Sequence, residues 1–358
     1  MTTVKKVLLH ARMHPQCLAS EKVYKSEVNN FMRTIAKITT IFLFLCFCGC
    51  QNNHKKNTHQ ETSKVIIQRI DGWSNFAYLV LIENKKLILR IPKKGTSKLK
   101  ALLKIATHNE YINSNQAYFW GIGAKVVFFD SSNDVFLLEY IKNKKTLEET
   151  DLQDENMLNE VTIILKKLHS SKTKFNNNIN IFSILERLVN FFDSNYMNSM
   201  PKDLSTVMRM VEQIKYIFGR LDIPSTPCHY DPNPGNFLLA NKRVYLIDWE
   251  YSGNNDPAWD LALLSATGNF THKQDNQMMN VYGNKRDNLL FKRVVVYKAL
   301  VQLWRFFFAR FQSKYINDPV EKQRFWEMSN IRYNDCKKIL SSNEFKDALN
   351  KLDQGKSR

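Results

Sequence analysis

A short hairpin flanked by polar residues constrains the fold of this chain more than any other feature. Two apolar segments, residues 238–239 and 244–247, are predicted as short strands joined by a turn. Asp231 and Asn236 precede the first strand in a loop rich in Pro and Gly, and Asp248 ends the second. One hairpin therefore supplies two carboxylates and an amide.

This residue set fits the chemistry of phosphoryl transfer. A carboxylate must orient or accept the proton of the attacking hydroxyl, which is the role predicted for Asp231. An amide oxygen and a second carboxylate must hold Mg²⁺ against nucleotide phosphates, which predicts Asn236 and Asp248 as metal ligands. The following Asp256-Pro-Ala-Trp-Asp260 makes the pattern more specific than an isolated loop.

The rest of the chain predicts strands first and helices second, and hence an α+β fold with two lobes. Strands are expected over residues 65–70, 77–82, 87–91, 126–129 and 135–141, with one helix over 99–118. Helices are expected over residues 156–169, 181–195, 204–221 and through the tail, 289–352. A loop-and-strand block is expected over residues 228–260. These elements divide the chain into an N-terminal nucleotide-binding lobe, 64–141, a C-terminal catalytic and substrate lobe, 142–352, and a tail, 353–358.

Residues 1–63 are predicted to lie outside the folded domain. A basic start at Met32, an apolar run over 38–47 and a small residue before Cys50 resemble a bacterial lipoprotein signal. Cys50 is then the lipidated residue and the membrane anchor. A buried or membrane-grazing extension is the alternative interpretation, and a metal site at the Cys-x-Cys-x-Cys stretch is a third. Residues 51–63 are polar and predict a linker.

The net charge of +18 over 358 residues suggests an anionic partner. Residues 1–63 contribute nine Lys and Arg against three Glu, or +6, which leaves +12 for the rest. Those remaining basic residues are dispersed and form no dense cluster with interleaved aromatics. We therefore expect no nucleic-acid partner.

The block HYDPNPGNFLL…LIDWEYSGNNDPAWDLALL resembles the choline/ethanolamine kinase and aminoglycoside phosphotransferase superfamily, and is closest to bacterial choline kinases. The resemblance implies a bilobal protein-kinase-like fold, with a small antiparallel sheet lobe and a larger, mainly helical lobe. It implies ATP and Mg²⁺ as cofactors and an alcohol as acceptor. Protein kinases have Asp-Phe-Gly where this chain has Asp248-Trp249-Glu250.

The N-terminal half extends the resemblance through Lys86-Leu-Ile-Leu-Arg90-Ile-Pro. It implies a nucleotide site in which Arg90 contacts the phosphates, Glu110 pairs with Arg90 and the loop before the second strand covers the phosphates. That loop has one Gly where the family often has two or more. Backbone groups at a hinge between the lobes are expected to bind adenine. The implied nucleotide-binding residues are Arg90, Glu110, Ser74, Asn75, Glu139, Tyr140 and Ile141.

The acceptor site is expected to suit a quaternary ammonium, which binds aromatic faces and carboxylates. The predicted substrate residues are Asp231, Glu250, Tyr251 and Trp304. Asp256 and Asp260 are expected to brace the catalytic loop, and Trp259 to pack in the core. His229 is interpreted as a structural residue near the metal carboxylate, with a general base as the alternative.

The function predicted from the sequence is an ATP- and Mg²⁺-dependent kinase for choline or a similar amino alcohol. One alternative is a kinase of the same fold for ethanolamine, thiamine or another small alcohol. Another is a non-catalytic, membrane-anchored binding protein on a kinase scaffold. The kinase domain is expected in the cytoplasm, or at the membrane where the signal before Cys50 is used.

Overall fold

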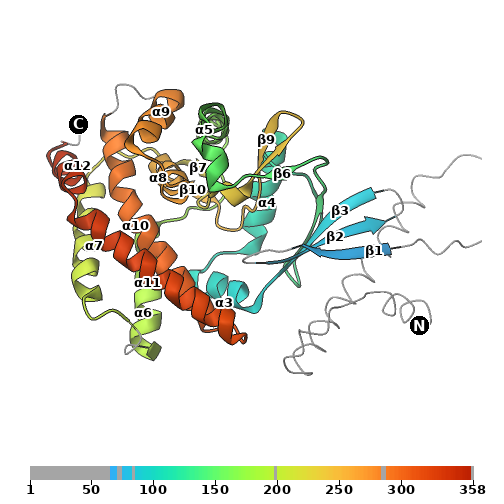
Figure 1. Ribbon diagram of the computed structural model, residues 1–358, viewed down its shortest axis with the longest axis horizontal. Helices are drawn as coiled ribbons and strands as arrows, with labels where there is room; N and C mark the ends of the chain where they lie inside the picture. Colours follow the sequence, from blue (N-terminus) through green and yellow to red (C-terminus); the bar gives the residue numbers. More distant parts are fainter. Residues whose placement is uncertain (1–64, 71–74, 83–84, 197–199, 284–287, 356–358) are drawn as a thin grey trace, which may run out of the picture. The chain divides into compact units, whose positions relative to one another are not determined.

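The computed structural model describes residues 65–70, 75–82, 85–196, 200–283 and 288–355 (Figure 1). The expected signal segment ending at Cys50 and the expected phosphate-loop residue Ser74 lie outside these residues. The chain divides into two compact units. Among the described residues, the first unit comprises those between 65 and 93 together with Val126–Tyr140, and the second comprises Lys94–Lys125 and those between 141 and 355.

The first unit is a five-stranded antiparallel sheet with the order β1-β2-β3-β5-β4. Its strands are β1 (Val65–Ile70), β2 (Asn75–Ile82), β3 (Lys85–Pro92), β4 (Val126–Asp130) and β5 (Val135–Glu139). The sequence predicted all five, because each is a short apolar run between polar turns. Alternate residues of the central strands, such as Leu87 and Leu89, form a small core with Val80, Val135 and Leu137.

The helix expected over residues 99–118 is wrong as a single element. The structure has two helices, α3 (Lys94–Leu103) and α4 (Thr107–Phe119), and both belong to the second unit. The chain turns between them at Lys104, whose φ of 57° is left-handed. Because neither Gly nor Pro marks this turn, the local pattern gave no sign of the break.

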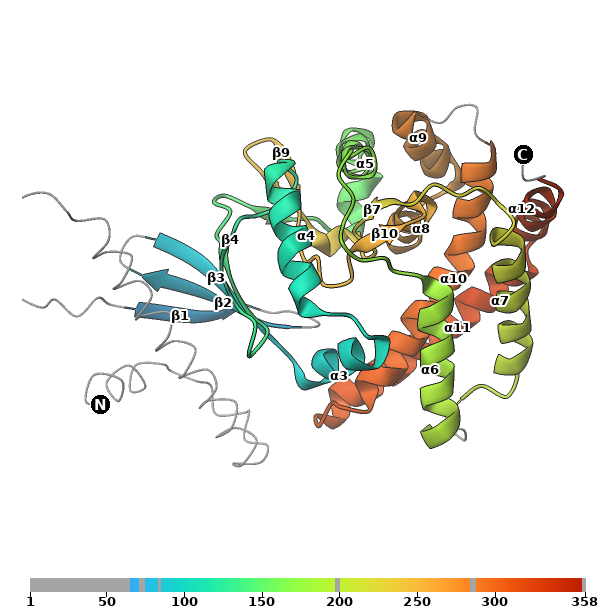
Figure 2. The same cartoon turned by 180° about the vertical axis from the view of Figure 1, so that it is seen from behind.

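The second unit is mainly helical. Its helices are α3, α4, α5 (Glu155–His169), α6 (Ile181–Tyr196), α7 (Leu204–Phe218), α8 (Pro257–Thr267), α9 (His272–Tyr282), α10 (Asn288–Ser313), α11 (Pro319–Ser341) and α12 (Asn343–Gln354). In both views α11 lies along α10 (Figures 1 and 2). The predicted helices over 156–169, 181–195 and 204–221 are confirmed as α5, α6 and α7. Their periodic apolar residues were recognisable because each helix presents an apolar face to one large core.

The catalytic hairpin predicted from the sequence consists of β8 (Phe237–Ala240) and β9 (Arg243–Leu246). The two strands are antiparallel, with Phe237 opposite Leu246. The short strand β6 (Lys145–Thr146) extends this sheet on the β8 side. A second small sheet pairs β7 (Thr226–Cys228) with β10 (Gly253–Asn255).

The expected loop-and-strand block over 228–260 ends earlier than predicted, because α8 begins at Pro257. Asp256 caps this helix by accepting a hydrogen bond from the Ala258 N–H at 2.9 Å. Most of α8 is buried, so its residues lack the alternation of apolar and polar residues that marks a surface helix. Among the described residues, no helix has both the length and the apolar character needed to cross a membrane.

Candidate functional site

The loop before the hairpin brings the predicted catalytic residues together. Asn236 donates from Nδ2 to the backbone oxygen of Asp231 at 2.8 Å and to its Oδ2 at 3.3 Å. The Ile247 N–H in turn donates to the Asn236 carbonyl at 2.9 Å, which continues the β8–β9 ladder. Because Asp248 directly follows Ile247, the hairpin holds all three side chains at one end, as the spacing predicted.

Two residues beside this constellation have left-handed backbone conformations. Tyr230, just before Asp231, has a φ of 71°, and Asp248 has a φ of 66°. Residues other than Gly adopt the left-handed region at an energetic cost, and such residues often cluster at functional sites. The surrounding contacts must therefore hold the two carboxylates in orientations that an unconstrained chain would avoid.

The electrostatic surroundings of Asp231 favour proton acceptance near neutral pH. Burial raises the pKa of the Asp231 carboxyl to about 7, and the negative charges of Asp248 and Glu250 act in the same direction. A hydrogen bond from the Asn233 side chain and the positive charge of Arg305 oppose this rise. A base with a pKa near the working pH is well matched to general base catalysis.

A buried carboxylate on α8 braces the catalytic loop. Asp260 accepts hydrogen bonds from the backbone N–H groups of His229 at 2.7 Å and Tyr230 at 2.8 Å. His169, at the end of α5, bonds to Asp260 Oδ2 through Nε2 at 3.1 Å, and to the Tyr282 hydroxyl through Nδ1 at 2.9 Å. The sequence predicted the bracing role of Asp260 but missed His169, because nothing near residue 169 records its distant partner.

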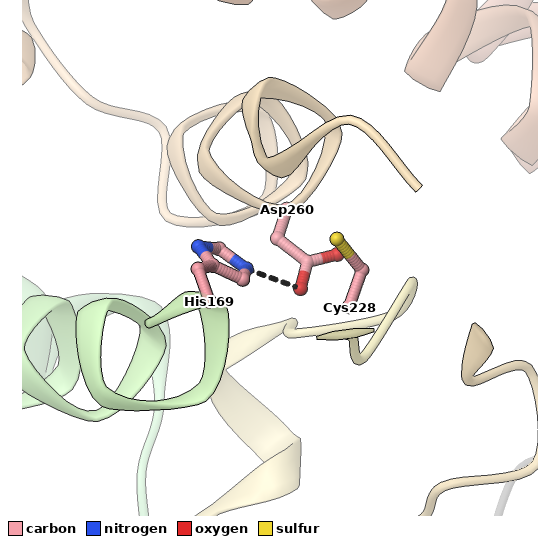
Figure 3. A group of neighbouring side chains, drawn as sticks. All are labelled: His169, Cys228 and Asp260. Carbon is pink, nitrogen blue, oxygen red and sulfur yellow. Dashed lines mark hydrogen bonds and ion pairs between the residues drawn. The ribbon is translucent and has the colours of Figure 1, made fainter. Parts of the chain in front are cut away.

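Figure 3 shows the His169 ring directed at the Asp260 carboxylate, with the Cys228 thiol beside it. Their ligand atoms lie within 4.8 Å of one another, close enough for a metal site. The hydrogen bonds already engage both Asp260 oxygens, and burial raises the pKa of the Cys228 thiol well above its usual range. We therefore assign this cluster to bracing the loop.

His229 is structural, as the sequence analysis interpreted it. It is fully buried, and its Nε2 donates to the Ile247 carbonyl at 2.9 Å, next to Asp248. Burial lowers the pKa of His229 to about 4, so the ring is neutral at pH 7. It thus links the start of the loop to the end of β9.

The structure brings two predicted acceptor residues together from distant parts of the sequence. The ring of Tyr251 meets the ring of Trp304, which lies on α10, edge to face with centroids 5.7 Å apart. Both side chains are buried, and the negative charges of Glu250, Asp231 and Asp248 raise the pKa of Tyr251 in addition to burial. The aromatic pair is therefore close enough to the carboxylates to feel their charge.

Two other residues considered for the site have structural roles. Trp259 is fully buried, stacks on Tyr230 with centroids 4.6 Å apart and donates from Nε1 to the Tyr230 carbonyl. Asp256 pairs with Arg293 at 2.8 Å, and both side chains are buried. Trp259 packs in the core as predicted, and Asp256 supports the start of α8.

Glu250 and Glu110 share a lysine that the sequence analysis missed. The Lys100 Nζ lies 2.9 Å from Glu110 Oε2 and 3.5 Å from Glu250 Oε2, and all three side chains are buried. The predicted pairing of Glu110 with Arg90 joins residues of different units and remains a prediction. Glu250 influences Asp231 and Tyr251 through its charge while its carboxylate contacts Lys100.

The nucleotide-binding candidates of the first unit lie on its central strands. Arg90, in β3, pairs with Phe136 in β5, and its guanidinium lies 4.7 Å from the Phe136 ring centroid. Asn75 starts β2 opposite Pro92 and is buried. The roles predicted for these residues in nucleotide binding rest on the resemblance alone.

The expected hinge residues lie where the two units divide. Glu139 ends β5 and is exposed, and Tyr140 packs against the Lys86 ammonium at 5.6 Å from the ring centroid. The first unit ends at Tyr140, and Ile141 begins the return to the second. The nucleotide-binding lobe expected over residues 64–141 remains a prediction, and Lys94–Lys125 within that range belongs to the second unit.

The donor set at the hairpin suits a hard divalent cation. Asp248 offers carboxylate oxygens, and Asn236 offers an amide oxygen because its amide nitrogen already donates to Asp231. Carboxylate and amide oxygens are the ligands that Mg²⁺ accepts. These residues therefore fit the metal ion that a kinase fold implies.

Comparison with known proteins agrees with this geometry. The choline/ethanolamine kinase family model matches residues 66–302. Protein LicA of Haemophilus influenzae is 30% identical over 262 residues, which cover 71% of this chain and 69% of that protein.

Solved structures show the same fold. A choline/ethanolamine kinase family protein from Mesorhizobium loti superposes with a TM-score of 0.70 at 26% identity, covering 82% of this chain and 95% of that one. The choline kinase LicA from Streptococcus pneumoniae gives a TM-score of 0.67 at 24% identity, covering 78% and 94%. Combined with the hairpin carrying Asp231, Asn236 and Asp248, these similarities identify the chain as a phosphotransferase with an alcohol acceptor, and it belongs to the choline/ethanolamine kinase family.

Proposed function

We propose that this chain transfers the γ-phosphoryl group of Mg·ATP to the hydroxyl of choline or a similar amino alcohol. The observation that carries this proposal is the grouping of Asp231, Asn236 and Asp248 at one hairpin end, with the buried Tyr251–Trp304 pair within reach of their charge.

In the proposed reaction, Asp231 accepts the proton of the acceptor hydroxyl. The hydroxyl oxygen forms a bond to the γ-phosphorus while the bond from that phosphorus to the β-phosphate oxygen breaks, and ADP leaves. A pKa of about 7 lets Asp231 hold the proton briefly and release it after transfer. The Asp260 brace holds the backbone from which Asp231 projects.

For the nucleotide, Asn236 and Asp248 are proposed to hold Mg²⁺, which when bound neutralises charge on the phosphates. Arg90, the loop containing Ser74 and Asn75, and the hinge at Glu139, Tyr140 and Ile141 are proposed to bind the phosphates and the base. Because ATP is the donor, we place the reaction in the cytoplasm.

For the acceptor, the aromatic faces of Tyr251 and Trp304 favour a quaternary or protonated amine. The negative charge of Glu250 adds to this preference, because it acts on both Tyr251 and Asp231. A cationic head bound at the aromatic pair would leave the hydroxyl of a short amino alcohol for Asp231.

A panel of acceptors tests the proposal. The purified chain is incubated with ATP, Mg²⁺ and choline, ethanolamine or thiamine, and ADP and the phosphorylated product are measured. We expect the highest kcat/KM for choline, full dependence on Mg²⁺ and a loss of about 10² to 10⁴-fold in Asp231→Ala.

Equal or faster phosphorylation of ethanolamine or thiamine would reject the choline assignment, and activity retained in Asp231→Ala would reject the mechanism. Choline binding by calorimetry without any ADP formation would support the non-catalytic binding protein instead.

A further inference from the structure

A buried cluster of three charged side chains lies beside the proposed metal carboxylate. Lys100 projects from α3 and contacts two carboxylates, Glu110 of α4 at 2.9 Å and Glu250 at 3.5 Å. The three side chains are only 8%, 1% and 2% exposed, respectively. Removing charges from water is costly, so a buried arrangement of this kind persists only where the geometry compensates.

A second contact joins helix α4 to the segment that contains Glu250. Asn113 lies three residues after Glu110 and therefore on the same face of α4. Its Nδ2 donates to Ser252 Oγ at 2.9 Å and to the Ser252 carbonyl at 3.3 Å, and the Asn113 side chain is fully buried. Helix α4 is thus connected to Ser252 directly through Asn113, and to Glu250 through Lys100 of α3.

The segment held in this way contains the left-handed Asp248. After Asp248 the chain makes a tight turn, in which the Ser252 N–H and hydroxyl both donate to the Trp249 carbonyl, at 3.1 and 2.6 Å. The turn begins one residue after Asp248, so fixing Glu250 and Ser252 restricts the backbone that orients the Asp248 carboxylate. Lys100 also places a positive charge 3.5 Å from Glu250, whose negative charge acts on Asp231.

We propose that Lys100 is a positioning residue for metal binding, because it ties Glu250 and α4 together and so fixes the orientation of Asp248. This inference rests on the proposed role of Asp248 as a Mg²⁺ ligand. Supporting groups around metal ligands typically contribute about 10 to 100-fold in metal affinity, so the effect should be measurable.

The test uses two variants of the full chain. Lys100→Met leaves the Glu110 and Glu250 carboxylates without the Lys100 charge, and we expect its melting temperature to fall. The double variant Lys100→Met with Glu110→Gln removes one positive and one negative charge, and we expect it to recover most of that stability. It still lacks the connection from Lys100 to Glu250.

The readout is the affinity for ADP, measured by calorimetry once with Mg²⁺ and once with EDTA. We expect Mg²⁺ to strengthen ADP binding in the wild type, and this gain to shrink by about tenfold or more in the double variant. Binding in EDTA should change little. Lys100→Arg, which keeps the charge, should restore part of the gain, and it also serves if the Met variants fail to fold.

Lys98→Met is the matched control, because Lys98 lies on the same helix, is exposed and packs on Tyr315 with its ammonium 4.6 Å from the ring centroid. It should leave the Mg²⁺ gain unchanged. A double variant with wild-type stability and an unchanged gain would overturn the positioning role, as would an equal loss in Lys98→Met.

Asp248→Asn separates this inference from the proposed function. If Asp248→Asn removes the Mg²⁺ gain while the Lys100 variants keep it, only the positioning role fails. If Asp248→Asn itself keeps the gain, the metal role proposed for Asp248 fails, and the positioning role fails with it.

Discussion

At the scale of single residues, Asp231 shows how burial and neighbouring charges set the pKa of the proposed catalytic base. Burial, Asp248 and Glu250 raise its pKa to about 7, while Arg305 opposes them. As the pH falls below about 7, a growing fraction of the carboxyl is protonated and cannot accept a proton from the acceptor hydroxyl. Because its pKa in the folded state lies above the usual 3.8, ionisation of Asp231 also lowers the free energy of unfolding as the pH rises through about 7.

The opposing charge of Arg305 gives a testable prediction. Arg305, half-buried on α10, favours the ionised form of Asp231. In Arg305→Met the carboxylate loses this support, so the pKa of Asp231 should rise by roughly half a unit or more. The acidic limb of the kcat/KM profile, measured from pH 5.5 to 9, should therefore move to higher pH.

Arg305→Lys controls for this change, because it keeps the positive charge and should leave the acidic limb near its wild-type position. A limb that moves to lower pH in Arg305→Met, or does not move at all, would show that the charge of Arg305 does not act on the catalytic base.

The aromatic pair gives a prediction about the acceptor. Trp304→Leu keeps an apolar side chain but removes the π face, so KM for choline should rise by about 3 to 30-fold. Trp304→Phe should have a smaller effect because it retains an aromatic ring. The uncharged carbon analogue 3,3-dimethylbutanol checks the cause, since its KM should be similar in the wild type and in Trp304→Leu. An equal increase in KM for choline and for the analogue would indicate lost packing and not lost cation–π attraction.

At the scale of elements, the start of α8 links stability to the site. Asp256 caps the helix and pairs with buried Arg293, and four residues later α8 carries the Asp260 brace. Asp256→Ala removes both interactions and leaves a buried guanidinium, so we expect a loss of about 3 kcal/mol or more in the free energy of unfolding. Urea unfolding followed by circular dichroism measures this loss.

Asp256→Asn separates the two contributions, because Asn caps a helix about as well as Asp but carries no charge. It should recover roughly 1 kcal/mol relative to Asp256→Ala. If Asn and Ala at position 256 are equally destabilising, the cap contributes nothing and the ion pair with Arg293 accounts for the whole effect.

The same elements show what the sequence could predict. The hairpin and its polar residues were predicted because turn residues, strand runs and the spacing of Asp231, Asn236 and Asp248 are all local. The break at Lys104 and the partners of Lys100 and His169 were not. A left-handed Lys has no local signature, and a bond such as His169 to Asp260 joins residues 91 positions apart. Asp256 followed by Pro257 was a readable helix start that the interpretation as a loop overlooked.

At the scale of the whole molecule, the family match and the described structure start at almost the same residue. Strand β1 starts at Val65 and the family model at residue 66. Residues 1–63 carry nine Lys and Arg against three Glu, a third of the net charge of +18. The sequence predicts that this part of the charge lies outside the catalytic unit, and the remaining +12 is spread over residues 64–358.

This division predicts that a chain beginning at Lys64 is a complete enzyme. All residues proposed for catalysis and binding follow residue 64, and truncation before the first strand removes no described contact of the sheet. We expect residues 64–358 to show kcat/KM for choline within about twofold of the full chain and a similar melting temperature. A second truncation that also removes β1 is the control, because it takes away the partner of β2 and should destabilise the sheet. A large loss of activity in the chain that begins at Lys64, with its melting temperature unchanged, would show that the first 63 residues contribute to the active site.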